Sequence, residues 1–374
     1  MKIRLAALGD VGLIGAVRGG IERHGAAWML EAVAPAFEGV DVTLFNLEMP
    51  FAPPHAHRPS HVREEFRVPP ALASALSFPG VRIACLANNH VMDFGLEGLR
   101  TTRATLAAAG ILDVGAGEDA ETAGSLSVVD VQGRRLGVLA FAQPGPHTSG
   151  PGACVAAADP AVVVQRVQSA RAKVDLLVVH LHHGAMYVDV PTPEGRQLAR
   201  AAASAGADLV LGHHPHVVQG VERVGTAVVA HSLGEFVFDA TVGHVLAHAA
   251  AEKRRESFVL RVDIDEAGVA AERIPVRMGS AGRPELPDAE TSAAMRARFD
   301  ALDRMLSVPD YEGLFRANAA TNLAGHEMRV LLSALRRGDF GYLLGKVSRV
   351  RPRHVRVLAS LLRRKLSPFT RASR

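Results

Sequence analysis

The feature of this 374-residue chain that most constrains its fold is the way its apolar runs end. Five runs have the composition of buried strands, and each finishes in carboxylate, amide or imidazole side chains. One of them is LVLGHHPHVVQG, residues 209–220, in which His213, His214 and His216 follow an apolar strand. A buried imidazole is costly unless its ring nitrogens find partners. This cluster therefore predicts a functional site in preference to an ordinary polar turn.

The apolar runs alternate with helical periodicity at 96–109 and 193–205, which predicts an α/β architecture. Two hairpins interrupt this alternation, one turning at Gln132-Gly133 and the other near Glu266-Ala267-Gly268. The expected strands are Ile3–Leu8, Val42–Asn46, Val81–Ala87, Val174–Leu181 and Leu209–Gly212.

Polar residues at the strand ends predict a metal centre. In open α/β sheets, ligands bind beyond the carboxyl ends of the strands, so we expect five consecutive strands to deliver these side chains to one edge. Carboxylate oxygens, amide oxygens and imidazole nitrogens together suit Mn, Fe, Zn or Ni. Two such ions can activate water and hold the attacking and leaving oxygens. The strand ends carry Asp10, Asn46, Glu48, Asn88, Asn89, His90, His180, His182, His183, His213, His214 and His216.

The composition excludes several classes of protein. Only two cysteines are present, Cys85 and Cys154, and neither lies in a CxxC motif, so we expect no disulfide framework and no thiolate metal centre. No apolar run is long enough to span a bilayer. The apolar part of MKIRLAALGDVGLIG is interrupted by Asp10 and is too short for a signal peptide. We therefore expect a cytoplasmic protein.

The charge is unevenly distributed along the chain. Residues 326–374 hold 13 Lys or Arg against two acids, which leaves 29 basic and 36 acidic side chains in the preceding 325 residues, out of 42 and 38 in all. This basic segment predicts either a solvated helical face or contact with an anionic membrane surface or acidic partner. It has few aromatic residues and no nucleic-acid-binding motif, so we expect no nucleic acid as a partner.

Six short blocks, taken in order, resemble the signature of the CapA family, which is named for capsule and poly-γ-glutamate synthesis. They are GDVGL, NLEMP, NNHVMDFGLEGL, HHGAMY, GHHPHVVQG and SLGEFVFD. The resemblance covers roughly residues 1–240 and implies a calcineurin-like metallophosphatase sandwich of two mixed β-sheets flanked by helices. We expect this domain to span residues 1–278, followed by a mainly helical basic segment at 279–374.

The resemblance also implies roles for individual residues. His90 matches the histidine that contacts substrate or gives a proton to the leaving group, and Asp93 would either orient His90 or cap the following helix. The residues expected to contact substrate are His183, His213 and Tyr187. The positions that match metal ligands are Asp10, Glu48, Asn89, His182, His214 and His216.

Three positions depart from the pattern of the wider superfamily or of CapA relatives. Gly12 stands where a histidine ligand would be, Met186 stands where a glutamate is usual, and Glu235 stands where an asparagine is usual. Glu235 adds a carboxylate that could act in catalysis. With these changes, the number of metal ions expected in the site is left open: one, two or none.

Three functions fit these residues. The first is metal-assisted hydrolysis or transfer at a phosphoester or at a peptide or γ-glutamyl amide, with His90 as general acid. The second is a metal-independent peptide epimerase that uses Asp10 and the histidines as acid–base groups. The third is a non-catalytic module that binds an acidic polymer in poly-γ-glutamate synthesis. The first is the principal prediction, with a peptide or acidic polymer as substrate.

Overall fold

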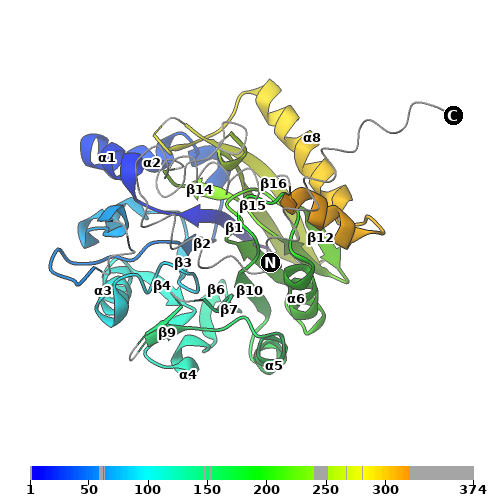
Figure 1. Ribbon diagram of the computed structural model, residues 1–374, viewed down its shortest axis with the longest axis horizontal. Coiled ribbons are helices and arrows are strands. Elements are labelled where there is room, and N and C mark those ends of the chain that lie inside the picture. Colours follow the sequence, from blue (N-terminus) through cyan, green and yellow to red (C-terminus); the bar gives the residue numbers. More distant parts are fainter. Residues whose placement is uncertain are drawn as a thin grey trace, which may run out of the picture.

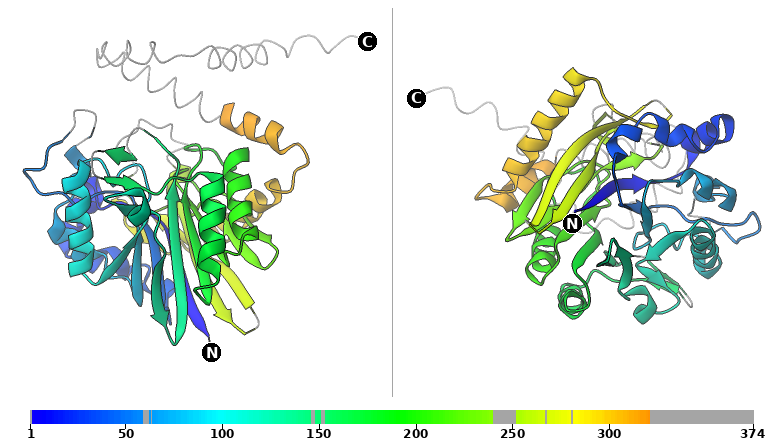
Figure 2. Two further views of the ribbon diagram at one scale, coloured as in Figure 1. Left: turned by 90° about the horizontal axis from the view of Figure 1, so that it is seen from below. Right: turned by 180° about the vertical axis from the view of Figure 1, so that it is seen from behind.

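The computed structural model describes residues 2–58, 62, 64–145, 148–150, 153–239, 252–266, 268–279 and 281–320. Two large sheets stack against each other, and helices cover the assembly from outside (Figures 1 and 2). The predicted α/β sandwich of two mixed sheets flanked by helices is therefore confirmed. Among the described residues, no helix combines the length and apolar character needed to cross a membrane.

The first sheet has the order β17-β16-β15-β1-β2-β3-β4, and β14 pairs with β1 off this path. Strands β1 to β4 are parallel, whereas β15 to β17 are antiparallel to their neighbours. The bounds are β1 Ile3–Val11, β2 Val42–Leu47, β3 Val81–Cys85, β4 Ile111–Val114, β14 Glu235–Val237, β15 Glu256–Asp265, β16 Gly268–Met278 and β17 Pro284–Glu285.

The second sheet has the order β12-β13-β11-β10-β7-β6, with β7, β10, β11 and β13 parallel. A small third sheet has the order β5-β9-β8. The bounds are β5 Ala116–Gly117, β6 Ser127–Val131, β7 Arg134–Ala142, β8 Ser149–Gly150, β9 Ala153–Val155, β10 Leu176–His182, β11 Leu209–His213, β12 Val221–Val224 and β13 Ala227–Ala230.

Several helices begin at a side-chain cap. Asp159, Thr192 and Asp288 each accept a hydrogen bond from a backbone N–H of the first turn, which satisfies donors that the helix leaves unpaired. The bounds are α1 Gly15–His24, α2 Trp28–Glu31, α3 Gly95–Ala108, α4 Ala120–Ala123, α5 Pro160–Arg171, α6 Pro193–Ser204 and α8 Ala289–Met305, with 3-10 turns η1 Ala34–Phe37, η2 Glu64–Phe66 and η3 Pro70–Ala75.

The two-residue period of the strands divides the core into two layers. In β10, Leu176 and Val178 belong to the core between the sheets, whereas Leu177 and Val179 pack with α5 and α6 on the outer face. This burial on both faces explains why the parallel strands read as continuous apolar runs and not as alternating ones.

The predicted strands are present with small shifts at their ends, but they do not form one edge of one sheet. Strands β1, β2 and β3 belong to the first sheet, whereas β10 and β11 belong to the second. The expectation of five consecutive strands was wrong in this respect, because β4 to β9 lie between them in the chain. The polar ends instead meet where the two sheets face each other.

The segment after residue 278 is described only as far as residue 320. Met295, Phe299 and Leu302 of α8 are buried in the same hydrophobic cluster as the first sheet, and Phe299 packs edge-on against Phe258 of β15 with ring centroids 5.5 Å apart. The basic residues predicted to bind an anionic surface begin beyond 325 and lie outside the described residues.

Candidate metal centre

Asp10 lies near the end of β1, between two strands that run parallel to it. The register pairs Asp10 with Asn46 of β2 on one side and with Glu235 of β14 on the other. Asp10, Glu235 and Glu48, which follows β2 directly, have no exposed surface. The first sheet therefore brings three carboxylates together, two at the carboxyl ends of β1 and β2 and one at the start of β14.

The second sheet supplies imidazoles from the facing side. Leu176 and Val178 of β10 face the first sheet. Because every second residue of a strand points the same way, His180 and His182 face it too. His182 lies opposite His213, the last residue of β11. Strand periodicity alone thus directs these histidines toward the carboxylates.

The loop after β11 holds His214 and His216 in a backbone conformation that is unusual for residues with a side chain. Their φ angles are 95° and 57°, on either side of Pro215. Each such conformation costs about 1–3 kcal/mol and persists where the surroundings enforce it, most often at functional sites. The strained loop aims both imidazoles at the strand ends.

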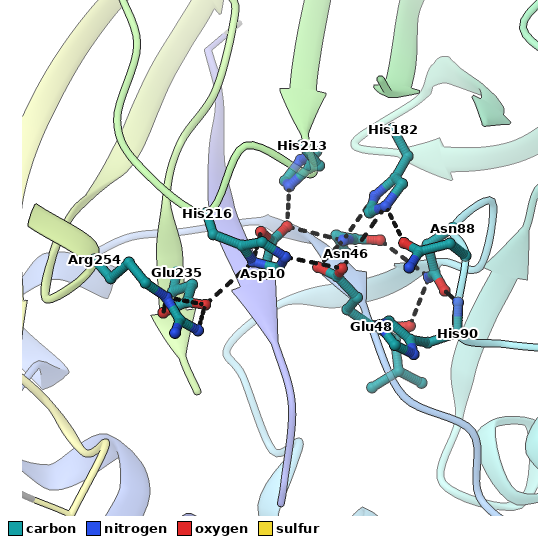
Figure 3. A network of polar contacts seen from close by, with 12 residues as sticks. Asp10, Asn46, Glu48, Asn88, His90, His182, His213, His216, Glu235 and Arg254 are labelled. Atoms are coloured by element: carbon teal, nitrogen blue, oxygen red, sulfur yellow. Dashed lines mark hydrogen bonds and ion pairs between the residues drawn. The ribbon is translucent and has the colours of Figure 1, made fainter. Parts of the chain in front are cut away.

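The predicted metal ligands gather in two groups that share Glu48 (Figure 3). The first group is Glu48, His182 and His214, and the second is Asp10, Glu48 and His216. Within each group the ligand-type atoms lie within 4.8 Å of one another. Asn89 extends the first group, because its Oδ1 lies 2.7 Å from Nε2 of His182.

Two asparagines orient the carboxylates. Nδ2 of Asn46 donates to Oδ1 of Asp10 at 2.8 Å and to Oε2 of Glu48 at 3.2 Å. Asn88 in turn donates to Oδ1 of Asn46 at 3.2 Å and to the carbonyl of Leu47 at 2.8 Å. Both asparagines stood at predicted strand ends, but no local pattern separates their role from that of Asn89.

The second oxygen of each of these two carboxylates is buried without a hydrogen-bond donor. Among the described residues, none donates to Oδ2 of Asp10 or to Oε1 of Glu48. The nitrogens of His216 approach them only to 3.4 and 3.6 Å. A buried acceptor without a donor is costly. Two such oxygens beside imidazole nitrogens fit a bound divalent cation, so the residues present suit the metal that the fold family implies.

The pKa values of the two carboxylates, Asp10 and Glu48, are shifted in opposite directions. Burial alone would raise the pKa of Asp10, yet the hydrogen bond with His213 and the nearby imidazole of His216 hold that pKa well below its ordinary value. Burial, with the nearby charge of Asp10, raises the pKa of Glu48 well above its ordinary value despite the opposing charge of His216. Repulsion between two carboxylates at one place separates their pKa values in this way.

The pKa values of the imidazoles are also shifted in opposite directions. Burial lowers the pKa of His182 well below its ordinary value, and burial with the charge of His216 lowers the pKa of His214 to about 3. His216 behaves oppositely: burial works against its charged form, but the charges of Glu48, Asp10 and Glu235 raise its pKa to about 10. His182 and His214 are therefore neutral, which is the form that binds a metal ion.

His90 lies at the rim of the centre, with 23% of its side chain exposed. Its Nδ1 lies 2.9 Å from Oδ2 of Asp93, and its ring stacks on Phe66 with centroids 4.3 Å apart. The cap position of α3 is Phe94, and no side chain caps it. Of the two roles predicted for Asp93, orienting His90 therefore fits the geometry better than capping the helix.

The three residues predicted to contact substrate take different positions. His213 is 1% exposed, and its Nδ1 lies 2.9 Å from Oδ1 of Asp10, so it contacts that carboxylate without reaching solvent. His183 directly follows His182 along the chain and therefore points to the opposite face. It lies beside Gly195 near the start of α6 and belongs to neither ligand group. Tyr187 is buried beside His216, with ring centroids 6.1 Å apart. None of the three faces the open rim as His90 does.

Glu235 forms an ion pair with Arg254, a residue that the sequence did not single out. Arg254 is fully buried, and its Nε donates to both oxygens of Glu235, at 3.0 and 3.1 Å. Oε1 of Glu235 also lies 3.1 Å from Nδ1 of His216 (Figure 3). Arg254 stands in the charged run EKRRES, which is typical of a solvated surface. No local signal separates it from Lys253 or Arg255.

Two mixed sheets whose strand ends converge on carboxylates, amides and imidazoles agree with the sandwich and polar centre that the CapA resemblance implied. Residues 4–240 match the family described as "Bacterial capsule synthesis protein PGA_cap", and the chain belongs to this family. The predicted CapA resemblance is therefore confirmed.

Two curated proteins and one solved structure show what the chain is similar to. The chain is 31% identical over 226 residues to "PGA biosynthesis protein CapA" of Bacillus subtilis (strain 168), which covers 58% of each protein. It is 28% identical over 256 residues to "Capsule biosynthesis protein CapA" of Bacillus anthracis, covering 64% of this chain and 60% of that one. The chain thus spans about three fifths of the length of these curated relatives. A crystal structure of a hypothetical protein from Thermus thermophilus aligns with a TM-score of 0.42 at 15% identity, over 72% of this chain and 99% of that chain.

Proposed function

We propose that this protein is a divalent-metal-dependent enzyme that hydrolyses, or transfers at, a peptide or γ-glutamyl amide or a phosphoester. The observation that carries the proposal is the pair of buried carboxylate oxygens, Oδ2 of Asp10 and Oε1 of Glu48, that accept no hydrogen bond from described residues and face imidazole nitrogens. Burial without compensation would cost several kcal/mol, and a cation would supply that compensation.

The metal would be held by the side chains that already converge. Glu48, His182 and His214, with Asn89 beside them, offer one oxygen and two neutral nitrogens plus an amide oxygen. When bound, a divalent ion supplies Lewis acidity and makes water a stronger nucleophile. Asn46 fixes the orientation of Glu48 through its 3.2 Å hydrogen bond, so the ligand set is preorganised before any ion binds.

His90 is suited to proton transfer. Asp93 occupies Nδ1, which leaves Nε2 as the ring nitrogen that can exchange a proton with substrate. The stack on Phe66 keeps the ring in that orientation. In amide hydrolysis, the water oxygen bonds to the carbonyl carbon, the C–N bond breaks, and Nε2 of His90 gives the departing nitrogen its proton. In phosphoester hydrolysis the proton goes to the leaving oxygen.

The names of the relatives support the γ-glutamyl amide as the first substrate to test. Two of them are named for poly-γ-glutamate or capsule biosynthesis. Poly-γ-glutamate is an acidic polymer, and one that is shortened or transferred during synthesis requires cleavage of its γ-glutamyl bonds. Because the fold serves many reactions, this substrate belongs to the proposal and not to the assignment of the family.

A second candidate is proton exchange at a carbon next to a carbonyl, as in a peptide epimerase. It is favoured by the two partly exposed imidazoles, His90 and His214, whose charges affect each other. Glu235 does not add to its support, because both of its oxygens accept hydrogen bonds from the buried Arg254. The remaining candidate is a non-catalytic module for acidic polymer.

One experiment separates the three candidates. Short γ-glutamyl oligomers are incubated with the protein and Mn²⁺ in water enriched in oxygen-18 and, separately, in D₂O, and the products are analysed by mass spectrometry. Hydrolysis places oxygen-18 in a new carboxylate, which is the expected result. Deuterium at an α-carbon without cleavage would indicate the epimerase. Retention of the intact, unlabelled oligomer by a folded protein would leave the binding module, provided that bis(p-nitrophenyl) phosphate is not cleaved either.

A further inference from the structure

The metal centre contains a positive charge that the proposed reaction does not use. Arg254 is fully buried, although an arginine is almost never buried without a charged partner. Its guanidinium donates to both oxygens of Glu235 and lies 5.5 Å from the ring centroid of Tyr187 and 6.0 Å from that of Phe238. An arginine in this position fixes a permanent charge next to the second ligand group.

The second ligand group is also closed on its remaining side. A Cβ atom added at Gly12 would lie 2.7 Å from the ring of Phe238, and that ring packs beside His216 with centroids 5.7 Å apart. A histidine cannot fit at Gly12 without displacing Phe238. The second group therefore has three ligand-type residues, all buried, whereas the first group has Asn89 nearby and the partly exposed His214.

The charges in direct contact balance for one ion and not for two. Asp10, Glu48 and Glu235 contribute three negative charges, and Arg254 contributes one positive charge. The formal charges of these four side chains sum to minus two, and a charged His216 beside them adds further positive charge that disfavours a second ion. One divalent ion brings the sum to zero, whereas two ions would leave two uncompensated positive charges in a buried site, which is strongly unfavourable.

We infer that the buried Arg254–Glu235 pair takes the place of a second metal ion, so that the centre holds one divalent ion on Glu48, His182 and His214. This inference rests on the proposed metal-dependent function and specifies how that function is built. Arg254 acts as a positioning residue: through Glu235 it holds His216, and His216 lies 3.4 Å from Asp10 and 3.6 Å from Glu48.

The test is the number of Mn²⁺ ions per chain, measured by equilibrium dialysis of the metal-stripped protein with Mn²⁺ alone, together with the electron paramagnetic resonance spectrum. We expect one ion per chain and the spectrum of an isolated Mn²⁺. Two ions with a spin-coupled spectrum would overturn the inference while leaving the proposed function intact. Failure to bind any ion would instead overturn the proposed function itself, so the two failures are distinguishable.

Variants of Arg254 test the charge argument. Arg254→Met removes the positive charge and should raise the ratio from one toward two ions per chain. Arg254→Lys keeps the charge and is the matched control, and Arg254→Met/Glu235→Gln removes both charges, so both should bind one ion. A folded Arg254→Met protein that binds only one ion would contradict the inference.

A pair of histidine variants decides the question without changing Arg254, in case Arg254→Met does not fold. His182→Ala removes a ligand of the first group and should abolish Mn²⁺ binding. His216→Ala removes a ligand of the second group only and should keep one ion, with at most a tenfold weaker affinity. The reverse result, with the ion lost in His216→Ala and kept in His182→Ala, would place the ion in the second group and overturn the inference.

Discussion

At the scale of single residues, the two types of histidine in this centre differ by their neighbours. His182 and His214 lie among other imidazoles and are neutral, whereas His216 lies among three carboxylates, and its pKa of about 10 keeps it charged when no metal is bound. Burial lowers the pKa values of His182 and His214, whereas at His216 the neighbouring carboxylates outweigh the effect of burial.

The rim histidine carries the first prediction. His90→Ala should lower turnover by about 100-fold or more, which is typical for the loss of a positioned general acid. Its Mn²⁺ content should not change, because His90 belongs to neither ligand group. His55→Ala is the control, since that side chain is 78% exposed. Turnover of a γ-glutamyl oligomer and the metal content are measured together, and loss of metal in His90→Ala would contradict the assigned role.

At the scale of elements, a partly buried polar network links β12 to α6. Oε1 of Glu222 accepts from Nε of Arg200 at 2.9 Å and lies 2.8 Å from Nε2 of His231. Burial alone would raise the pKa of Glu222, but these partners lower it from 4.5 to about 2. The ionised carboxylate is therefore stabilised in the folded protein relative to the unfolded chain.

Linkage fixes the pH dependence of this contribution. Because the folded pKa is below the unfolded one, the stabilisation is complete above pH 4.5 and is lost as the pH falls toward 2. Glu222→Gln should cost about 1–2 kcal/mol of unfolding free energy at pH 7, and the difference from wild type should shrink in acid. Urea unfolding at several pH values measures it. Glu118→Gln, in an exposed pair with Arg100, is the control and should leave stability close to that of wild type.

The packing of helix α8 bears on where the domain built from the two sheets ends. The sequence places the boundary at 278/279, but Phe299 of α8 has no exposed surface and packs against Phe258. Phe299→Ala should lower the unfolding free energy by about 3–5 kcal/mol, as expected for a fully buried aromatic ring. A calorimetric transition that keeps the wild-type midpoint would show that α8 is separable from the sandwich, as the predicted boundary implies.

At the scale of the whole molecule, the positions of the strands along the chain and the polar residues at their ends could be predicted, because both depend on local patterns. The apolar runs predicted β1, β2, β3, β10 and β11 within a few residues, and the polar residues after them included the side chains that gather in the two candidate ligand groups. The division of these strands between two sheets could not be predicted, because sheet partners are set by long-range packing. The burial of Arg254 could not be predicted for the same reason, because it depends on a partner, Glu235, 19 residues away along the chain.

The basic segment at 326–374 gives a prediction for the full chain. Its excess of Lys and Arg should favour an anionic surface at low ionic strength and lose that attraction as salt rises. A chain truncated after residue 325 should keep turnover and metal content but sediment less with vesicles that contain phosphatidylserine. Equal sedimentation of both chains, or lost turnover of a small substrate in the folded truncated chain, would contradict the separate roles.

The central claim is that a divalent metal held around Glu48 makes this family member an enzyme. Its most direct test is the turnover of a γ-glutamyl oligomer by chelator-stripped protein as Mn²⁺ is added back, with Glu48→Gln alongside. The account predicts no turnover when stripped, full recovery with Mn²⁺, and no recovery in Glu48→Gln, because that carboxylate is common to both ligand groups. Full turnover by stripped wild-type protein would contradict it.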